Sequence, residues 1–269
     1  MTGNAVLEAI SKSKIYDLGQ PYYNGMPVHP MDPPFQLFLY KYHEHTKKHF
    51  EEMAPEFADA ISLVVTSMHS GTHIDSPIHM SRNLKVLGED ITQYQDSAGF
   101  TGLPESLPSM AETEQFVLRT VLLDVVAYKG VDILPQRYEI TPEDLQGAAE
   151  MGGKDINPGD AVLIRTGYSR YFESDPDIYL HKFAGLNADA ATWVAKKDIK
   201  LFGIDNLSIG MPMPFDCHNI LLSDHGIFTL KGLKLDELAA DKHYESTLIV
   251  SPLKIKGGEA SLVRPLAIA

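Results

Sequence analysis

The sequence predicts an α/β protein built on a mixed β-sheet. Over the second half of the chain, segments rich in β-branched and aliphatic residues alternate with segments that carry helix caps. The chain has 269 residues, of which 44% are hydrophobic, and this is enough for a large core. No internal repeat or linker-like change in composition is visible, so we expect one domain that spans residues 1–269.

The first quarter of the chain is expected to be mostly extended or irregular. Residues 1–14 favour a short polar helix or arm, and residues 15–18 favour a short strand. The many prolines of residues 25–34 forbid a helix and favour an extended wall. Residues 35–58 alternate aromatic and charged side chains. This pattern indicates an exposed strand that leads into a lid or a helix.

Helix and strand signals are stronger after residue 115, whereas residues 82–115 are polar and irregular. Thr141 followed by Pro142 is a good helix start, because threonine caps the first turn and proline fits it. Asn187 is a second cap of this kind. The signals predict helices over residues 141–152, 187–197 and 233–241, and strands over residues 116–127, 161–164, 201–205, 247–251 and 262–268.

Charge and composition exclude several classes of partner. The formal net charge is −13, which repels nucleic acid and anionic membranes, and the two lysine pairs at 47–48 and 196–197 are isolated. No window approaches 18 consecutive apolar residues, and residues 1–14 lack a basic stretch followed by an apolar one. We therefore expect a cytoplasmic protein that binds neither nucleic acid nor membranes.

The chain has one cysteine, Cys217, so it has no intramolecular disulfide, and a reducing compartment fits. His218 follows directly, which raises the possibility of a Cys/His nucleophilic pair. Adjacent side chains on an extended segment point to opposite faces, and no residue that would orient the histidine is identifiable. A buried, unreactive thiol is the better interpretation.

The densest group of chemically active residues runs from His69 to His79. It holds three histidines and one aspartate within eleven residues, and it follows the apolar run 61–66, which we expect to be the rigid strand that presents them. His69 and His73 have helical i, i+4 spacing, but the residues between them, Ser-Gly-Thr, are poor in a helix interior, and no glutamate follows His69. A helical HExxH metalloprotease site is therefore rejected.

An extended segment accounts for these residues better. In such a segment His73 and Asp75 share one face, and Gly71 lets the chain fold back so that His69 can join them. Two imidazoles and a carboxylate form an open ligand set that suits Zn²⁺, Mn²⁺ or Fe²⁺. A bound metal of this kind lowers the pKa of water to about 7. His79 lies beyond the rigid Pro77, and we expect it to act as the general acid or base.

Other histidines carry weaker signals. His29 lies in the proline-rich wall and could face a ligand or simply the solvent. Three histidines at positions 43, 45 and 49 invite a metal interpretation, but Tyr, Lys and Glu interleave them, so an exposed strand or lid is favoured over a metal site.

The stretch His69-Ser-Gly-Thr-His-Ile-Asp-Ser-Pro-Ile-His79 resembles the cyclase family of metal-dependent hydrolases, whose hallmark is H-x-G-T-H-x-D-x-P-x-H. The family includes bacterial kynurenine formamidase and isatin hydrolase. The resemblance extends to residues 17–18 and 25–28, Pro-Gly-Asp at 158–160, Arg-Thr-Gly at 165–167, Gly-Ile-Asp at 203–205, residues 252–255 and residues 264–268.

This resemblance implies a swivelling β/β/α fold, with a barrel-like mixed sheet flanked by helices, that assembles as a homodimer or homotetramer. It implies that His69, His73 and Asp75 bind the metal and that His79 is the catalytic acid or base. The implied substrate is a small molecule.

The sequence also departs from the family pattern. His218 matches a histidine that helps bind a second metal in the formamidases, but Lys231 stands where those enzymes carry glutamate. A lysine repels a second cation, so we expect about one Mn²⁺ or Zn²⁺ per chain, with His218 as an additional ligand or a substrate contact. Met80 replaces a frequent phenylalanine, and His29 replaces a substrate-stacking tryptophan, which makes a substrate-binding role for His29 an expectation.

Three functions remain open from the sequence. The leading one is hydrolysis of an amide, formamide or lactone by metal-activated water, with His79 moving the proton. The alternative enzyme is a metal-dependent lyase or cyclase in which His79 abstracts a proton from a carbonyl compound. The third is a binding protein without catalysis, and it does not account for a histidine outside the metal triad.

Overall fold

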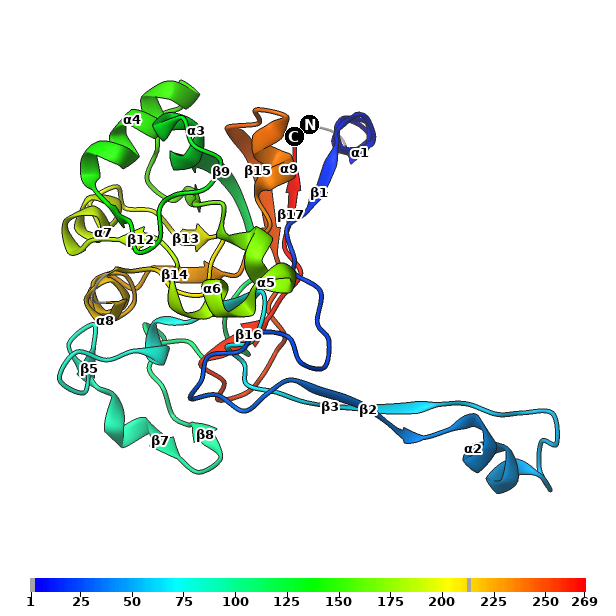
Figure 1. Cartoon of the computed structure of the whole chain (residues 1–269). Coiled ribbons are helices and arrows are strands. Elements are labelled where there is room, and N and C mark those ends of the chain that lie inside the picture. The colour runs from blue at the N-terminus through cyan, green and yellow to red at the C-terminus, as the bar shows by residue number, and fades with distance from the viewer. Residues whose placement is uncertain (1–2, 212–213) are drawn as a thin grey trace.

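A nine-stranded mixed sheet forms the body of the protein, as seen in the computed structural model, which describes residues 3–211 and 214–269 (Figure 1). Four parallel strands lie at its centre. They are β9 (Phe116–Asp124), β11 (Ala161–Arg165), β13 (Leu201–Ile204) and β14 (Phe228–Lys231). The prediction of an α/β protein with a mixed sheet is confirmed.

Antiparallel strands extend the sheet at both ends. Beyond β9 lie β15 (Glu245–Val250), β17 (Leu266–Ile268) and β1 (Ile15–Asp17), so that the first and last strands of the chain pair with each other. Beyond β14 lie β4 (His73–Asp75) and β16 (Ala260–Leu262). The sheet thus carries the segment with the histidines as a paired strand near its edge.

Side chains of the central strands alternate between two apolar cores. In β11, Val162 and Ile164 belong to one core, and Ala161 and Leu163 belong to the other. The first core lies under helices α3 (Val125–Lys129), α4 (Pro142–Gly152) and α7 (Ala188–Ala195), which Figure 1 shows together on one side of the sheet. Helix α9 (Asp236–Ala240) packs into the second core.

The predicted caps begin helices α4 and α7. The hydroxyl of Thr141 accepts a hydrogen bond from the amide of Asp144 at 3.3 Å, and the side chain of Asn187 accepts one from the amide of Ala190 at 2.8 Å. Gly153 ends α4 with a φ of 62°, in the left-handed region that favours glycine. Helices α4 and α7 are therefore confirmed close to their predicted bounds.

A two-stranded arm projects from the body (Figure 1). It consists of β2 (Gln36–Lys41), helix α2 (His43–Phe50) and β3 (Ile61–Val65). Within the described residues, β2 and β3 pair only with each other. The expectation of an exposed strand followed by a helix is correct. The expectation that the run 61–66 is the rigid strand that presents the histidines is wrong, because every residue of β3 is exposed. The buried strand β4 carries His73 and Asp75 instead.

Several elements have no clear sequence signal. They are β14, the short 3₁₀ helix η1 (Pro77–His79), β5–β8 between residues 85 and 100, α5 (Tyr171–Ser174), α6 (Pro176–His181), α8 (Pro214–His218), and the π-helical segment η4 (Asn219–Asp224). Cys217 and His218 therefore lie on a helix, which corrects the extended segment assumed for them. Of the two alternatives for the N-terminal segment, helix or arm, the structure shows a helix, α1 (Gly3–Lys12). None of the helices within the described residues is long and apolar enough to cross a membrane.

Candidate active site

All of the predicted site residues except the buried Asp75 line one pocket of about 400 Å³. Its polar lining includes His69, His73, His79, His218 and Lys231. Its other walls are mostly apolar, with His29, Pro30, Asp32, Met80, Leu180, His181, Phe183, Leu207, Ser208, Pro214 and Phe215. The three histidines of α2 do not line it.

Strand β4 fixes two of the candidate ligands. It lies between β14 and β16, with His73 opposite Lys231 and Asp75 opposite Thr229. Because side chains of a strand alternate, His73 and Asp75 emerge on one face, while Ile74 is fully buried in the second apolar core. Pairing on both sides makes this a rigid support for ligands.

A tight turn before β4 returns His69 to the same face. Gly71 has a φ of 56°, and a Cβ atom there would lie 2.9 Å from the ring of Tyr22, so the turn requires glycine. His69 Nδ1 lies 2.9 Å from Asp75 Oδ1, and His73 Nε2 lies 3.6 Å from the same oxygen. The two imidazoles and the carboxylate thus converge on one point.

His79 joins the same cluster from η1. One ligand atom from each of His69, Asp75 and His79 lies within 4.8 Å of the others, and the rings of His69 and His79 are 3.9 Å apart between centroids. Sequence reasoning set His79 apart from the ligands. The structure places it as close to His69 and Asp75 as a fourth ligand would be.

The buried nitrogen of His73 tests whether a metal fits here. Its Nδ1 donates a hydrogen bond to the carbonyl of Gly71 at 3.0 Å, so Nε2 carries the lone pair in the neutral ring. This buried Nε2 has no hydrogen-bond partner in the described part of the chain. A free lone pair directed toward a carboxylate suits a divalent cation, and the donor set fits one.

Burial keeps most of these imidazoles neutral. It lowers the pKa of His73 and of His218 to about 3, and it lowers the pKa of His79 well below its usual value. His69 differs, because hydrogen bonds to Asp75 and Glu259 outweigh its burial and raise its pKa to about 9. Burial alone would raise the pKa of Asp75, but Lys231 and the nearby histidines hold it well below its usual value. The neutral rings of His73, His79 and His218 and the ionised carboxylate of Asp75 are the forms that bind metal, whereas His69 must release one ring proton to do so.

Lys231 places an ammonium group inside this cluster. Its Nζ lies 2.8 Å from Asp75 Oδ2 and 3.3 Å from His218 Nε2, and the whole residue is buried at the end of β14. The hydroxyl of Thr229 also donates to Asp75 Oδ2, at 3.0 Å. One oxygen of Asp75 is therefore occupied by protein donors, and the other faces the histidines.

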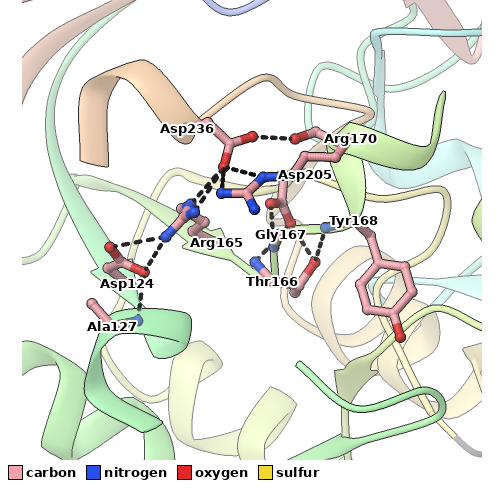
Figure 2. Close-up of polar contacts among 10 residues, drawn as sticks. Asp124, Ala127, Arg165, Thr166, Gly167, Tyr168, Arg170, Asp205 and Asp236 are labelled. Atoms are coloured by element: carbon pink, nitrogen blue, oxygen red, sulfur yellow. Dashed lines mark hydrogen bonds and ion pairs between the residues drawn. The ribbon is translucent and has the colours of Figure 1, made fainter. Parts of the chain in front are cut away.

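A second polar network lies at the ends of β11 and β13 (Figure 2). At the end of β11, the guanidinium of Arg165 bridges Asp124 and Asp236 at 3.1 and 2.7 Å. The fully buried Asp205 accepts bonds from the backbone amides of Thr166 and Gly167, both at 2.8 Å. Asn206, which follows Asp205, donates to the hydroxyl of Thr166 at 3.4 Å and accepts from the amide of Ser208 at 3.1 Å. Ser208 lines the pocket, so the network is linked to the pocket wall.

Sequence reasoning missed Glu259, whose Oε1 lies 3.2 Å from His69 Nε2. It also missed the aromatic pair Phe183 and Phe215 at the pocket wall. Glu259 is 190 residues from His69 in sequence, and only the pairing of β4 with β16 brings them together. No local pattern indicates such a contact.

Comparison with known proteins identifies the family of this chain. A sequence profile of the family described as "Putative cyclase" matches residues 16–210. The chain belongs to the cyclase family. Among curated relatives of this cyclase-family chain, the kynurenine formamidase of Bacillus thuringiensis subsp. konkukian (strain 97-27) is 28% identical over 259 residues, which cover 94% of this chain and 96% of the relative. The kynurenine formamidase of Bacillus anthracis is 27% identical over the same shares.

Solved structures of cyclase-type proteins confirm the predicted fold. A structure described as a novel cyclase superimposes with a TM-score of 0.85 at 25% identity, over all of this chain and 92% of the other. Isatin hydrolase A from Ralstonia solanacearum gives a TM-score of 0.72 at 21% identity, over all of this chain and 97% of the other.

Proposed function

We propose that this cyclase-family protein is a metal-dependent hydrolase that opens an amide, formamide or lactone bond of a small cyclic or aromatic substrate. The observation that carries the proposal is the unpartnered Nε2 of His73, which converges with His69 on Asp75 Oδ1 beside His79 in a pocket. The kynurenine formamidases, 28% identical or less among those compared, and the isatin hydrolases of like fold support the same class of reaction.

In this proposal His69, His73 and Asp75 would hold Mn²⁺ or Zn²⁺, and the ion would lower the pKa of water and polarise the substrate carbonyl. His79 is neutral and can take a proton from the attacking water, then return it to the leaving nitrogen or oxygen. Lys231 and Thr229 hold Asp75 ionised and oriented. The apolar wall with Phe183 and Phe215 suits a flat ring.

Lys231 also argues for about one ion per chain. A second divalent cation beside Asp75 and His218 would lie against an ammonium that already contacts both residues. Elemental analysis of the metal-loaded protein tests this number directly. A ratio near two would contradict it.

The function is tested by assaying the manganese- and zinc-loaded protein against N-formylkynurenine, isatin and a panel of lactones. Chelation should abolish turnover, and either metal should restore it. In ¹⁸O-labelled water, hydrolysis places one solvent oxygen in the new carboxylate. Turnover without that label would identify a lyase or cyclase reaction, and turnover by verified metal-free protein would eliminate the metal-dependent mechanism.

We further propose that the protein acts as a homodimer or homotetramer, because the arm exposes apolar side chains on both of its faces.

We also propose that the enzyme is located in the cytoplasm. Its one cysteine is buried and unpaired, which fits a reducing compartment.

A further inference from the structure

His69 lies between two carboxylates, one on each ring nitrogen. Its Nδ1 is 2.9 Å from Asp75 Oδ1, inside the cluster, and its Nε2 is 3.2 Å from Glu259 Oε1, on the other side of the ring. Glu259 does not line the pocket, and it is not part of the group of ligand atoms around Asp75. Its carboxylate therefore contacts the site only through His69.

The backbone of Glu259 is held by the same strand pairing that holds Asp75. The carbonyl of Glu259 accepts a hydrogen bond from the amide of Ser76 at 2.9 Å, and Ala260 is the register partner of Asp75. The Glu259 side chain is 33% exposed, so it reaches His69 from the solvent side. This anchoring fixes where the carboxylate can lie relative to the imidazole.

A histidine binds a metal through one nitrogen, and the partner of the other nitrogen sets the orientation and basicity of the ring. For His73 that partner is the carbonyl of Gly71, and for His218 it is the carbonyl of Pro214. His69 alone among these three has a carboxylate in this place. A carboxylate makes the ring a stronger electron donor than a neutral carbonyl does.

We infer that Glu259 is a positioning residue for the metal site: it accepts a hydrogen bond from His69 Nε2–H. This leaves Nδ1, on the side of Asp75, as the nitrogen that gives up its proton and binds the ion. This inference rests on the proposed metal dependence. It assigns a task to a residue outside the H-x-G-T-H-x-D-x-P-x-H motif, and it predicts which nitrogen of His69 meets the metal.

Metal affinity of the full-length protein tests the inference. Zn²⁺ is titrated against a chromophoric chelator for wild type, Glu259→Gln and Glu259→Ala. Glu259→Ala should weaken binding by about 10- to 100-fold, the usual effect of losing such a partner. Glu259→Gln keeps an oxygen acceptor and should recover part of the loss. Glu89→Ala, which removes an exposed carboxylate of β6 (Glu89–Asp90), should bind like wild type.

Two further measurements separate positioning from a general structural effect. Long-range ¹H–¹⁵N correlations of the zinc-loaded wild type should show His69 protonated at Nε2 and bound through Nδ1. Thermal unfolding of the metal-free variants should match metal-free wild type. Equal affinity in wild type and Glu259→Ala, or zinc bound through Nε2, would overturn the inference. A wild type that binds no metal would instead refute the proposed function.

Discussion

At the scale of single residues, the site gives each of four side chains a different environment. His73 is buried with a free lone pair, His69 is bonded on both nitrogens, and Asp75 has one oxygen occupied by Lys231. His79 is the member whose distance from the others does not reveal its task, because it lies as close to the cluster as a ligand would. Substitution has to separate proton transfer from metal binding.

We predict that His79→Gln lowers kcat by at least about 10²-fold and retains the metal, because a general base typically contributes about 10²–10⁴ in rate. His73→Gln should instead lose the metal, since it removes the buried lone pair. Turnover and bound metal are measured on the same preparations. If His79→Gln loses its metal as fully as His73→Gln does, His79 is a ligand and another group moves the proton.

At the scale of elements, β11 ends in a buried ionic network that ties three segments together. Arg165 contacts Asp124 at the end of β9 and Asp236 at the start of α9. Its side chain is 10% exposed, and that of Asp124 is 3% exposed. Asp236 also accepts from Ser169, and its pKa is lowered because these hydrogen bonds outweigh the effect of burial. Removal of the guanidinium would leave two carboxylates without their main partner.

Arg165→Met should therefore lower the free energy of unfolding by about 3–5 kcal/mol, the usual cost of leaving a buried charge unpaired. Urea denaturation at neutral pH measures this loss. Arg264→Met is the matched control, because the Arg264–Asp17 pair is exposed and such pairs contribute little. A loss for Arg165→Met no larger than that of the control would show that the network does not stabilise the fold.

The sequence predicted the elements whose signals are local. The caps at Thr141 and Asn187 and the apolar runs of β9 and β11 depend on neighbouring residues, so they could be read directly. The run 61–66 has the composition of a buried strand, yet it lies in the exposed arm, because hydrophobicity does not specify a partner. The H-x-G-T-H-x-D-x-P-x-H motif predicted His69, His73, Asp75 and His79 as site residues. The contacts of Glu259 and Lys231 with them arise from strand pairing across the sheet, which no local pattern encodes.

At the scale of the whole molecule, the arm has apolar side chains that remain exposed in a single chain. Leu37 pairs with Val64 on one face of the hairpin, and Phe38 pairs with Leu63 on the other, and all four side chains are 44–48% exposed. A two-stranded hairpin is at best marginally stable alone in water. Apolar surface on both faces indicates that another protein surface encloses the arm. A second copy of the chain is the partner that is always present.

We predict that the purified protein has two or four times the mass of one chain in size-exclusion chromatography with light scattering. Replacing one face of the arm, as in Phe38→Ser with Leu63→Ser, should shift it toward the monomer, because the substitutions remove the apolar area that would be buried between subunits. Leu253→Ser, at a residue 57% exposed on the body, is the matched control and should keep the wild-type mass. A wild type that is monomeric at micromolar concentration would contradict the prediction. So would an arm variant of unchanged mass, because the arm would then be enclosed by something other than its own copy.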